Sequence, residues 1–196
     1  ENIKNYYPLE KGDTWTYSLE QFQNDKPNTK FKKMIISVEN KTNNTAIIKR
    51  FYPDSTMQPN MTKAIISNEK IELSRHEVLL EKNMKSLINS LGINSIDIIK
   101  APLNKGNSWE GRVFSGGTET IIVEGSEIIE VPAGKFQTIK LNHKIKYNNG
   151  KEDNLYYWYA KNIGTIKMYE EISLHLNNDS WIKMKSIGIL EKHSLN

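Results

Sequence analysis

The sequence contains no cysteine. This absence excludes disulfide bonds, thiolate metal sites and a cysteine nucleophile. No apolar run is long enough for a transmembrane helix. Arginine is also scarce, since only three of the 27 basic residues are arginine. Nucleic-acid sites favour arginine forks and aromatic residues within a basic cluster. The lysines here are instead interspersed with glutamates, as on a solvated surface, so we predict no nucleic-acid partner despite a net charge of +4.

One short stretch occurs twice in the chain. Residues 8–15 read Pro-Leu-Glu-Lys-Gly-Asp-Thr-Trp, and residues 102–109 read Pro-Leu-Asn-Lys-Gly-Asn-Ser-Trp. Five of the eight positions are identical, and the offset of 94 residues is close to half the chain length of 196. We predict one domain over residues 1–196 with an internal repeat, about 7–100 and 101–196, in which each copy begins with a turn and enters a strand through its tryptophan.

Most of the remaining sequence alternates between apolar and polar residues, the period of β-strands. Turn-forming residues such as Asn148-Asn149-Gly150 separate these segments. We count about ten strands, and pairing of neighbours in the chain makes the sheet antiparallel. A sheet of so many twisted strands does not stay flat. The predicted fold is therefore mainly β, a single curled antiparallel sheet forming an open barrel or half-barrel.

One segment, residues 77–91, changes to helical spacing. Its apolar residues recur at i, i+4, i+7 and i+11, and Gly92 follows where a helix would end. We predict an amphipathic helix that covers the concave side of the sheet. If its packing on the sheet is loose, the gap is a site for an apolar ligand; if it is tight, the interface is core. The candidate ligand-binding residues on this helix are Leu80, Met84, Leu87 and Leu91.

The run Tyr156-Tyr157-Trp158-Tyr159 is the most distinctive group of side chains. Alternation places Tyr156 and Trp158 on one face of a strand, and the other two on the opposite face. One pair belongs to the core. The other pair, which we take as Tyr156 and Trp158, is a candidate platform for stacking a ligand, although cross-strand aromatic packing explains both pairs without one.

The sequence carries no recognisable catalytic motif, and we predict a protein that is not an enzyme. No G-x-S-x-G elbow, P-loop or G-x-G-x-x-G is present. Glu119, Glu124, Glu127 and Glu130 could supply the carboxylate pair of a glycoside hydrolase. The simpler interpretation places all four on the polar face of a strand.

The histidines do not form a metal-binding pattern either. His76, His143, His175 and His193 are scattered, with no H-x-H or H-E-x-x-H spacing. With cysteine absent as well, we predict no catalytic residues, no metal site and no cofactor.

Three segments resemble a broad group of uncharacterised bacterial proteins that are secreted or lipid-anchored. They are Y-P-L-x-x-G-x-x-W-x-Y at residues 7–17, V-P-A-G-x-F-x-T at 131–138, and W-Y-A-x-x-I-G-x-I-K at 158–167. The architecture is similar to that of curled-sheet envelope lipoproteins that carry or sense lipids. The resemblance implies a place in the envelope of a bacterium, which the composition suggests is Gram-positive: secreted, or held at the outer face of the cytoplasmic membrane by a lipid anchor upstream of Glu1. It brings no catalytic residues.

These observations favour a non-catalytic binding protein of the bacterial envelope. One version holds a lipid or another apolar small molecule between sheet and helix. The alternative is an adaptor lipoprotein that docks an envelope protein or a cell-wall enzyme and modulates it. A hydrolase whose residues assemble only in the fold is the third and weakest reading. Contact with the membrane is expected only through an upstream anchor.

Overall fold

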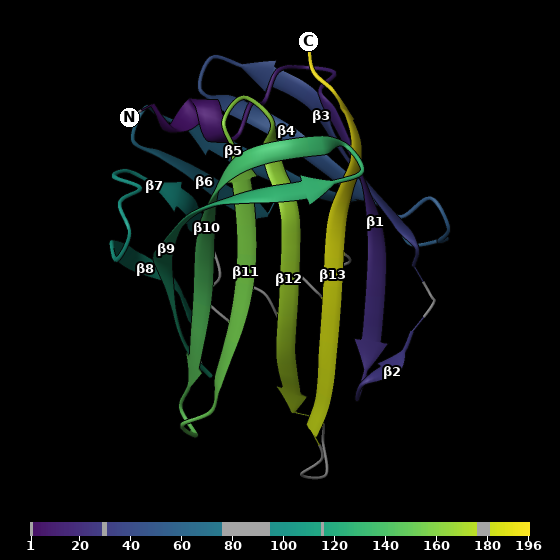
Figure 1. Cartoon of the computed structure of the whole chain (residues 1–196), viewed down its shortest axis with the longest axis vertical. Coiled ribbons are helices and arrows are strands. Elements are labelled where there is room, and N and C mark those ends of the chain that lie inside the picture. Colours follow the sequence, from purple (N-terminus) through teal and green to yellow (C-terminus); the bar gives the residue numbers. More distant parts are fainter. Residues whose placement is uncertain (1, 29–30, 76–94, 115, 176–180) are drawn as a thin grey trace.

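A computed structural model describes residues 2–28, 31–75, 95–114, 116–175 and 181–196. Within them, thirteen strands form one antiparallel sheet in the order β7-β6-β5-β4-β3-β1-β13-β12-β11-β10-β9-β8, with β2 paired to β1. Because β1 lies between β3 and β13, the first and last strands of the chain are neighbours and the sheet curls almost into a barrel (Figure 1). The prediction of a mainly β, curled antiparallel sheet is confirmed.

The strands are joined mostly by short turns. Their bounds are β1 (Thr14–Gln23), β2 (Lys26–Pro27), β3 (Lys33–Thr42), β4 (Thr45–Phe51), β5 (Asn60–Ile66), β6 (Lys70–Arg75), β7 (Ser95–Lys100), β8 (Ser108–Phe114), β9 (Gly117–Val131), β10 (Gly134–Tyr147), β11 (Glu152–Ala160), β12 (Gly164–His175) and β13 (Trp181–Ser194). The count exceeds the expected ten partly because β2 is too short to show a period, and because Ser95–Lys100 forms a strand that its sequence does not mark as one.

Alternation along the strands decides which side chains face the inside of the curl. In β3, Met34, Ile36 and Val38 are buried, and in β10, Leu141, His143 and Ile145 are buried. Successive side chains of a strand point to opposite faces, so these sets line the inner face and their neighbours line the outer face. The buried apolar residues join into one core cluster inside the sheet.

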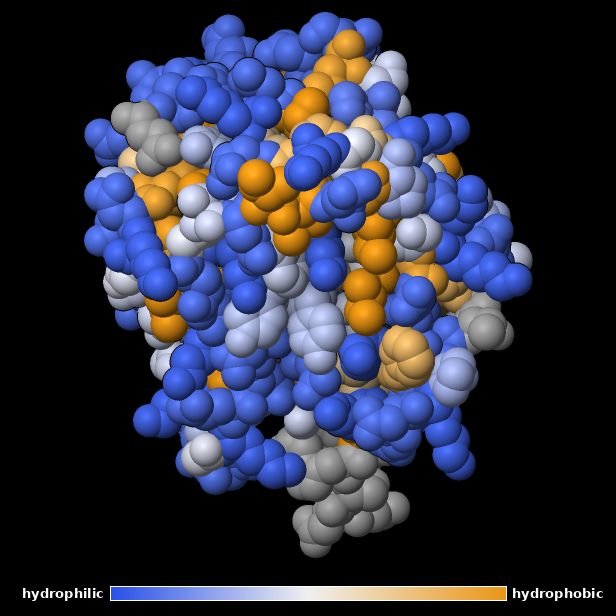
Figure 2. All heavy atoms as spheres, in the orientation of Figure 1, coloured by the Kyte–Doolittle hydropathy of each residue, from blue (hydrophilic) through white to orange (hydrophobic). Residues whose placement is uncertain are grey.

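The hairpin of β9 and β10 is longer than its neighbours and crosses outside the sheet. Gly125, at φ +127°, marks a bulge where the pairing of β9 with β10 shifts by one residue. Beyond it the hairpin runs across β11, β12 and β13 (Figure 1), and the N–H of Ala133 donates to the carbonyl of Leu190 in β13 at 3.3 Å. Hydrophobic side chains gather where it crosses, on a face that is otherwise mostly hydrophilic (Figure 2). One of them, Ile128, is 59% exposed.

The two Pro-Leu-x-Lys-Gly turns adopt the same local structure. Gly12 and Gly106 have φ of +93° and +90°, a region in which glycine is the least strained residue. The N–H of Gly12 donates to the carbonyl of Val38 at 2.9 Å, and that of Gly106 donates to the carbonyl of Val123 at 2.8 Å. The first turn thus joins the start of β1 to β3, its neighbour in the sheet, and the second joins the start of β8 to β9. Correspondence of the two complete halves stays a prediction.

The predicted helix over residues 77–91, with Leu80, Met84, Leu87 and Leu91, lies outside the described residues. Within the described part of the chain, the helical element is a 3-10 helix, η1 (Ile3–Tyr6). No helix among the described residues has the length and apolarity needed to cross a membrane.

Candidate functional site

The aromatic run of β11 divides between the two faces as alternation predicts. Tyr159 is buried in the core, and Tyr157 packs against the core from the inner face. Tyr156 and Trp158 point outwards, with ring centroids 6.2 Å apart. Trp158 is nevertheless only 7% exposed, because the β9–β10 hairpin covers it and its indole N–H donates to Glu127 at 2.7 Å.

Lysines occupy the ring faces of this outward pair. The Nζ of Lys140 lies 4.5 Å from the ring centroid of Tyr156 and 5.2 Å from that of Trp158, and the Nζ of Lys167 lies 5.0 Å from the latter. Cation–π contacts of this kind stabilise exposed sheets modestly. Since the rings already have partners, the pair is a weaker candidate for a stacking platform than the inner face described next.

A buried polar cluster on the inner face joins β8, β9 and β10. Glu119 is 0% exposed, which corrects the expectation that it lies on the polar face; Glu124, Glu127 and Glu130 are exposed as expected. Arg112 donates from Nε to Glu119 at 2.6 Å and from a terminal nitrogen at 3.2 Å. His143 Nδ1 lies 2.9 Å from the other carboxylate oxygen.

The cluster keeps Glu119 ionised. Burial alone would raise the pKa of this carboxyl, but the hydrogen bonds and charges of His143 and Arg112 lower it further, to about 2. An ionised carboxylate only accepts, so His143 donates from Nδ1. The space for the carboxylate comes from Gly111, since a Cβ there would lie 2.9 Å from the Cγ of Glu119. His143 Nε2 is buried and has no partner among the described residues.

We expect Glu119 to stabilise the fold above about pH 4.5 and to lose this effect in acid. Its pKa is lower in the folded chain than in the unfolded chain, so the stabilisation is present above the unfolded value and disappears as pH falls towards 2. The shift corresponds to roughly 3 kcal/mol. Urea unfolding of wild type and Glu119→Gln at pH 6, 4 and 2.5 checks this. The difference between the two proteins should shrink with falling pH, and a constant difference would contradict it.

A second group of inner-face residues surrounds Arg50, near the end of β4. Ala46 and Ile48 share its face of the strand and are buried, but Arg50 itself is exposed. Its guanidinium donates no hydrogen bond and forms no ion pair with any residue of the chain that the structure describes. Its side chain therefore lies on the inner face of the curl, where it is partly exposed.

Tyrosines from other strands face the same space. Burial raises the pKa of Tyr7, Tyr17, Tyr157 and Tyr159. The positive charge of Arg50 offsets a smaller part of each of these rises. These residues come from β1, β11 and the segment after η1.

An acidic residue completes this group. Burial lowers the pKa of Arg50, but Glu170 in β12 and the tyrosines Tyr7, Tyr52 and Tyr157 raise it more. Glu170 already accepts the hydroxyl of Tyr157 at 2.6 Å. We call Tyr7, Arg50, Tyr52, Tyr157 and Glu170 the tyrosine–arginine site.

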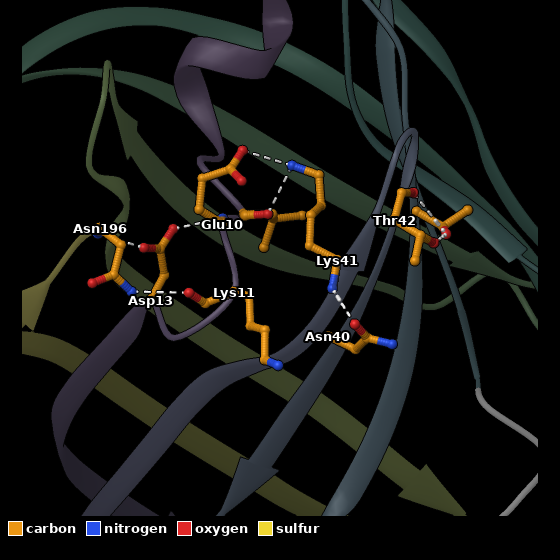
Figure 3. Close-up of polar contacts among 9 residues, drawn as sticks. Glu10, Lys11, Asp13, Asn40, Lys41, Thr42 and Asn196 are labelled. Atoms are coloured by element: carbon orange, nitrogen blue, oxygen red, sulfur yellow. Dashed lines mark hydrogen bonds and ion pairs between the residues drawn. The ribbon is translucent and has the colours of Figure 1, made fainter.

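A separate pocket of about 300 Å³ lies beside the first Pro-Leu-x-Lys-Gly turn. Figure 3 shows the polar contacts among its turn residues. Lys41 Nζ binds the carbonyl of Leu9 at 3.0 Å and Glu10 at 2.7 Å, while Asp13 accepts the backbone N–H groups of Glu10 at 2.7 Å and Asn196 at 2.8 Å. These contacts stabilise the turn, so we place the candidate site at the tyrosine–arginine site instead.

The described residues contain no group of three or more His, Asp or Glu side chains that could hold a metal ion. Sequence reasoning missed Glu119 and Arg50 as inner-face residues. Two signals were available: Glu119 shares its parity with Ile121 and Val123, and arginine is rare in a chain that otherwise uses lysine. The candidates Leu80, Met84, Leu87 and Leu91 lie outside the described residues.

The fold and the site define a class of protein: a curled antiparallel sheet, nearly a barrel, with charged and tyrosine side chains on part of its inner face. A family described as DUF3108-like matches residues 121–171, about a quarter of the chain, from β9 into β12. The matched segment contains His143 and the aromatic run. No curated protein sequence matches the chain.

Two crystal structures share the fold along almost the whole chain. One is a candidate exported protein with a YmcC-like fold from Bacteroides fragilis, with a TM-score of 0.58 and 14% identity, covering 97% of this chain and 99% of that one. The other is a candidate lipoprotein from Parabacteroides distasonis, with a TM-score of 0.53 and 17% identity, covering 96% of this chain and 98% of that one. At such identities the likeness shows a common fold.

Proposed function

We propose that this protein is a non-catalytic binding protein of the bacterial cell envelope, which holds an amphipathic ligand against the inner face of its curled sheet. The observation that carries this proposal is the exposure of Arg50 on a face whose other residues in β4 are buried. A side chain so placed lines space that the protein leaves to solvent. The two crystal structures with a similar fold are of a candidate exported protein and a candidate lipoprotein, which supports the envelope location.

Apolar side chains elsewhere on the inner face are also only partly buried. Leu19 follows Tyr17 on the inner face of β1, and Leu73 follows Ile71 on the inner face of β6; both leucines are half-buried while Tyr17 and Ile71 are buried. Tyr52 packs its ring on Phe31 at a centroid distance of 4.6 Å. A wall with partly exposed leucine and tyrosine beside a charged group suits a molecule that has an apolar body and a polar end.

Solvent extraction of the purified protein followed by mass spectrometry, together with titration of an environment-sensitive apolar dye, tests the proposal. We expect lipid to co-purify or the dye to bind the native protein. Leu19→Trp adds bulk on the inner face and should weaken dye binding several-fold. Glu20→Trp adds the same bulk on the outer face of the same strand and should leave dye binding unchanged. Failure of both lipid and dye to bind would refute the proposal.

A further inference from the structure

Arg50 and Arg112, the arginines whose side chains the structure describes, both belong to the inner face but are used differently. Arg112 lies against a fully buried carboxylate and donates two side-chain hydrogen bonds to it. Its charge is therefore matched within the protein. The guanidinium of Arg50 donates no hydrogen bond and has no ion pair among the described residues, although it belongs to the inner face. A guanidinium carries five N–H donors in a planar fork, and in Arg50 all of them remain available.

The surroundings of Arg50 add further donors. The hydroxyl groups of Tyr7 and Tyr52 make no hydrogen bond within the described chain, and both residues are near enough to act on the pKa of Arg50. Both tyrosines are only partly buried. Tyr157 differs, because its hydroxyl is already bound to Glu170. One cation and two hydroxyls thus face the solvent on the inside of the sheet.

From this arrangement we infer that the tyrosine–arginine site recognises the anionic group of the ligand, a carboxylate or a phosphate, through the guanidinium of Arg50. The planar guanidinium can donate to two oxygens of a carboxylate or of a phosphate at once. Such charge-assisted pairs are stronger than neutral hydrogen bonds. The hydroxyls of Tyr7 and Tyr52 donate to the remaining oxygens. Glu170 stays as an acceptor for a hydroxyl or ammonium group next to the anion. The inference rests on the proposed function and adds the chemistry of the ligand's polar end.

The local structure gives a reason for arginine at this position. The chain uses lysine for nearly all of its positive charges, 24 of 27. A lysine would offer a compact, strongly hydrated charge, whereas arginine offers a fork that binds two oxygens at once. Lys49, the residue before Arg50, faces the opposite side of β4, and its Nζ lies 5.2 Å from the ring centroid of Phe51. It carries the same charge on the same strand and provides a matched control.

Isothermal titration of the full chain with three probes tests the inference. Oleate presents a carboxylate, dihexanoyl-phosphatidylglycerol presents a phosphate, and oleyl alcohol is the neutral counterpart of oleate. We expect wild type to bind at least one of the anionic probes, and to bind the alcohol at least about tenfold more weakly than oleate if oleate is the preferred probe. Arg50→Gln should weaken binding of the preferred anion by about 10- to 100-fold. Arg50→Lys should retain part of the affinity, and Lys49→Gln should match wild type.

The outcomes separate the inference from the proposed function. Arg50 makes no hydrogen bond in the described chain, so Arg50→Gln should unfold at nearly the wild-type temperature, and its binding can be compared directly. If Arg50→Gln binds the anionic probes as tightly as wild type, or if oleyl alcohol binds as well as both anions, the inference is overturned and the binding function stands. If wild type binds neither the anions, the alcohol nor the apolar dye, the inference and the proposed function are both wrong.

Discussion

Replacing Glu119 by alanine is expected to lower the free energy of unfolding by about 3–5 kcal/mol, the usual cost of breaking a buried ion pair. The carboxylate is fully buried and accepts from both Arg112 and His143. Without it, the guanidinium keeps its positive charge but loses the carboxylate to which it is hydrogen-bonded, and His143 loses the hydrogen bond of its Nδ1. Chemical denaturation at neutral pH, monitored by tryptophan fluorescence, measures the change.

Glu130→Ala is the matched control for this experiment. Glu130 lies on the same strand, β9, but is exposed, so its replacement should change stability by no more than about 0.5 kcal/mol. The double variant Glu119→Leu with Arg112→Met removes both charges and should recover part of the loss, because an apolar pair can replace a buried ion pair. A Glu119→Ala protein as stable as the control would show that the cluster does not stabilise the fold.

The strand content was predictable because it follows from local patterns. Alternation identifies the long strands, and asparagine and glycine mark the turns between them. Gly125 interrupts an alternating stretch, which indicates a turn or a bulge, and the structure shows a bulge at φ +127°. The strand Ser95–Lys100 was missed because Ile98 and Ile99 are adjacent and both buried, which interrupts alternation; the pairing of β6 with β7 contains a bulge near this point.

The candidate site was harder to predict because it depends on contacts between distant strands. Parity alone could have placed Glu119 inwards with Ile121 and Val123, since no bulge separates them. Glutamate side chains are usually solvated, so a solvated position is expected for Glu119 in spite of the alternation. The place of Arg50 opposite Glu170 and Tyr157 follows from the closure of β1 on β13, which brings the strands of the two halves face to face. Nothing local in residues 45–51 encodes that closure.

The segments that resemble envelope proteins have structural roles here. Trp15, in the first segment, donates its indole N–H to the carbonyl of Ile163 in the third at 2.6 Å. Gly164 lies against the same indole, where a Cβ would be 3.5 Å from Nε1. The N–H of Asn162 donates to the carbonyl of Asn5 close by. These residues hold the start of β1 on the β11–β12 turn, so the two segments help to fix how the sheet closes.

The two tryptophans of the repeated turn should therefore differ in their effect on stability. Trp15→Ala is expected to cost about 3–5 kcal/mol, the range for a buried large aromatic residue. Trp15 is 4% exposed and fastens the closure of the sheet. Trp109 makes a similar bond, from its indole N–H to the carbonyl of Asp97 at 2.8 Å, but it is only half-buried. Trp109→Ala should cost about 2 kcal/mol, because less apolar surface is lost from the core.

Denaturant unfolding of the two single variants and of the double variant measures these costs. Trp15→Phe serves as a control, since it keeps most of the ring volume and removes the indole N–H; it should cost less than Trp15→Ala. If the turns are equivalent anchors of two duplicated halves, each single variant destabilises the protein and the costs add in the double variant, as expected for distant sites. A Trp109→Ala protein with wild-type stability would show that the second turn anchors nothing, and the duplication would then be confined to the local turn.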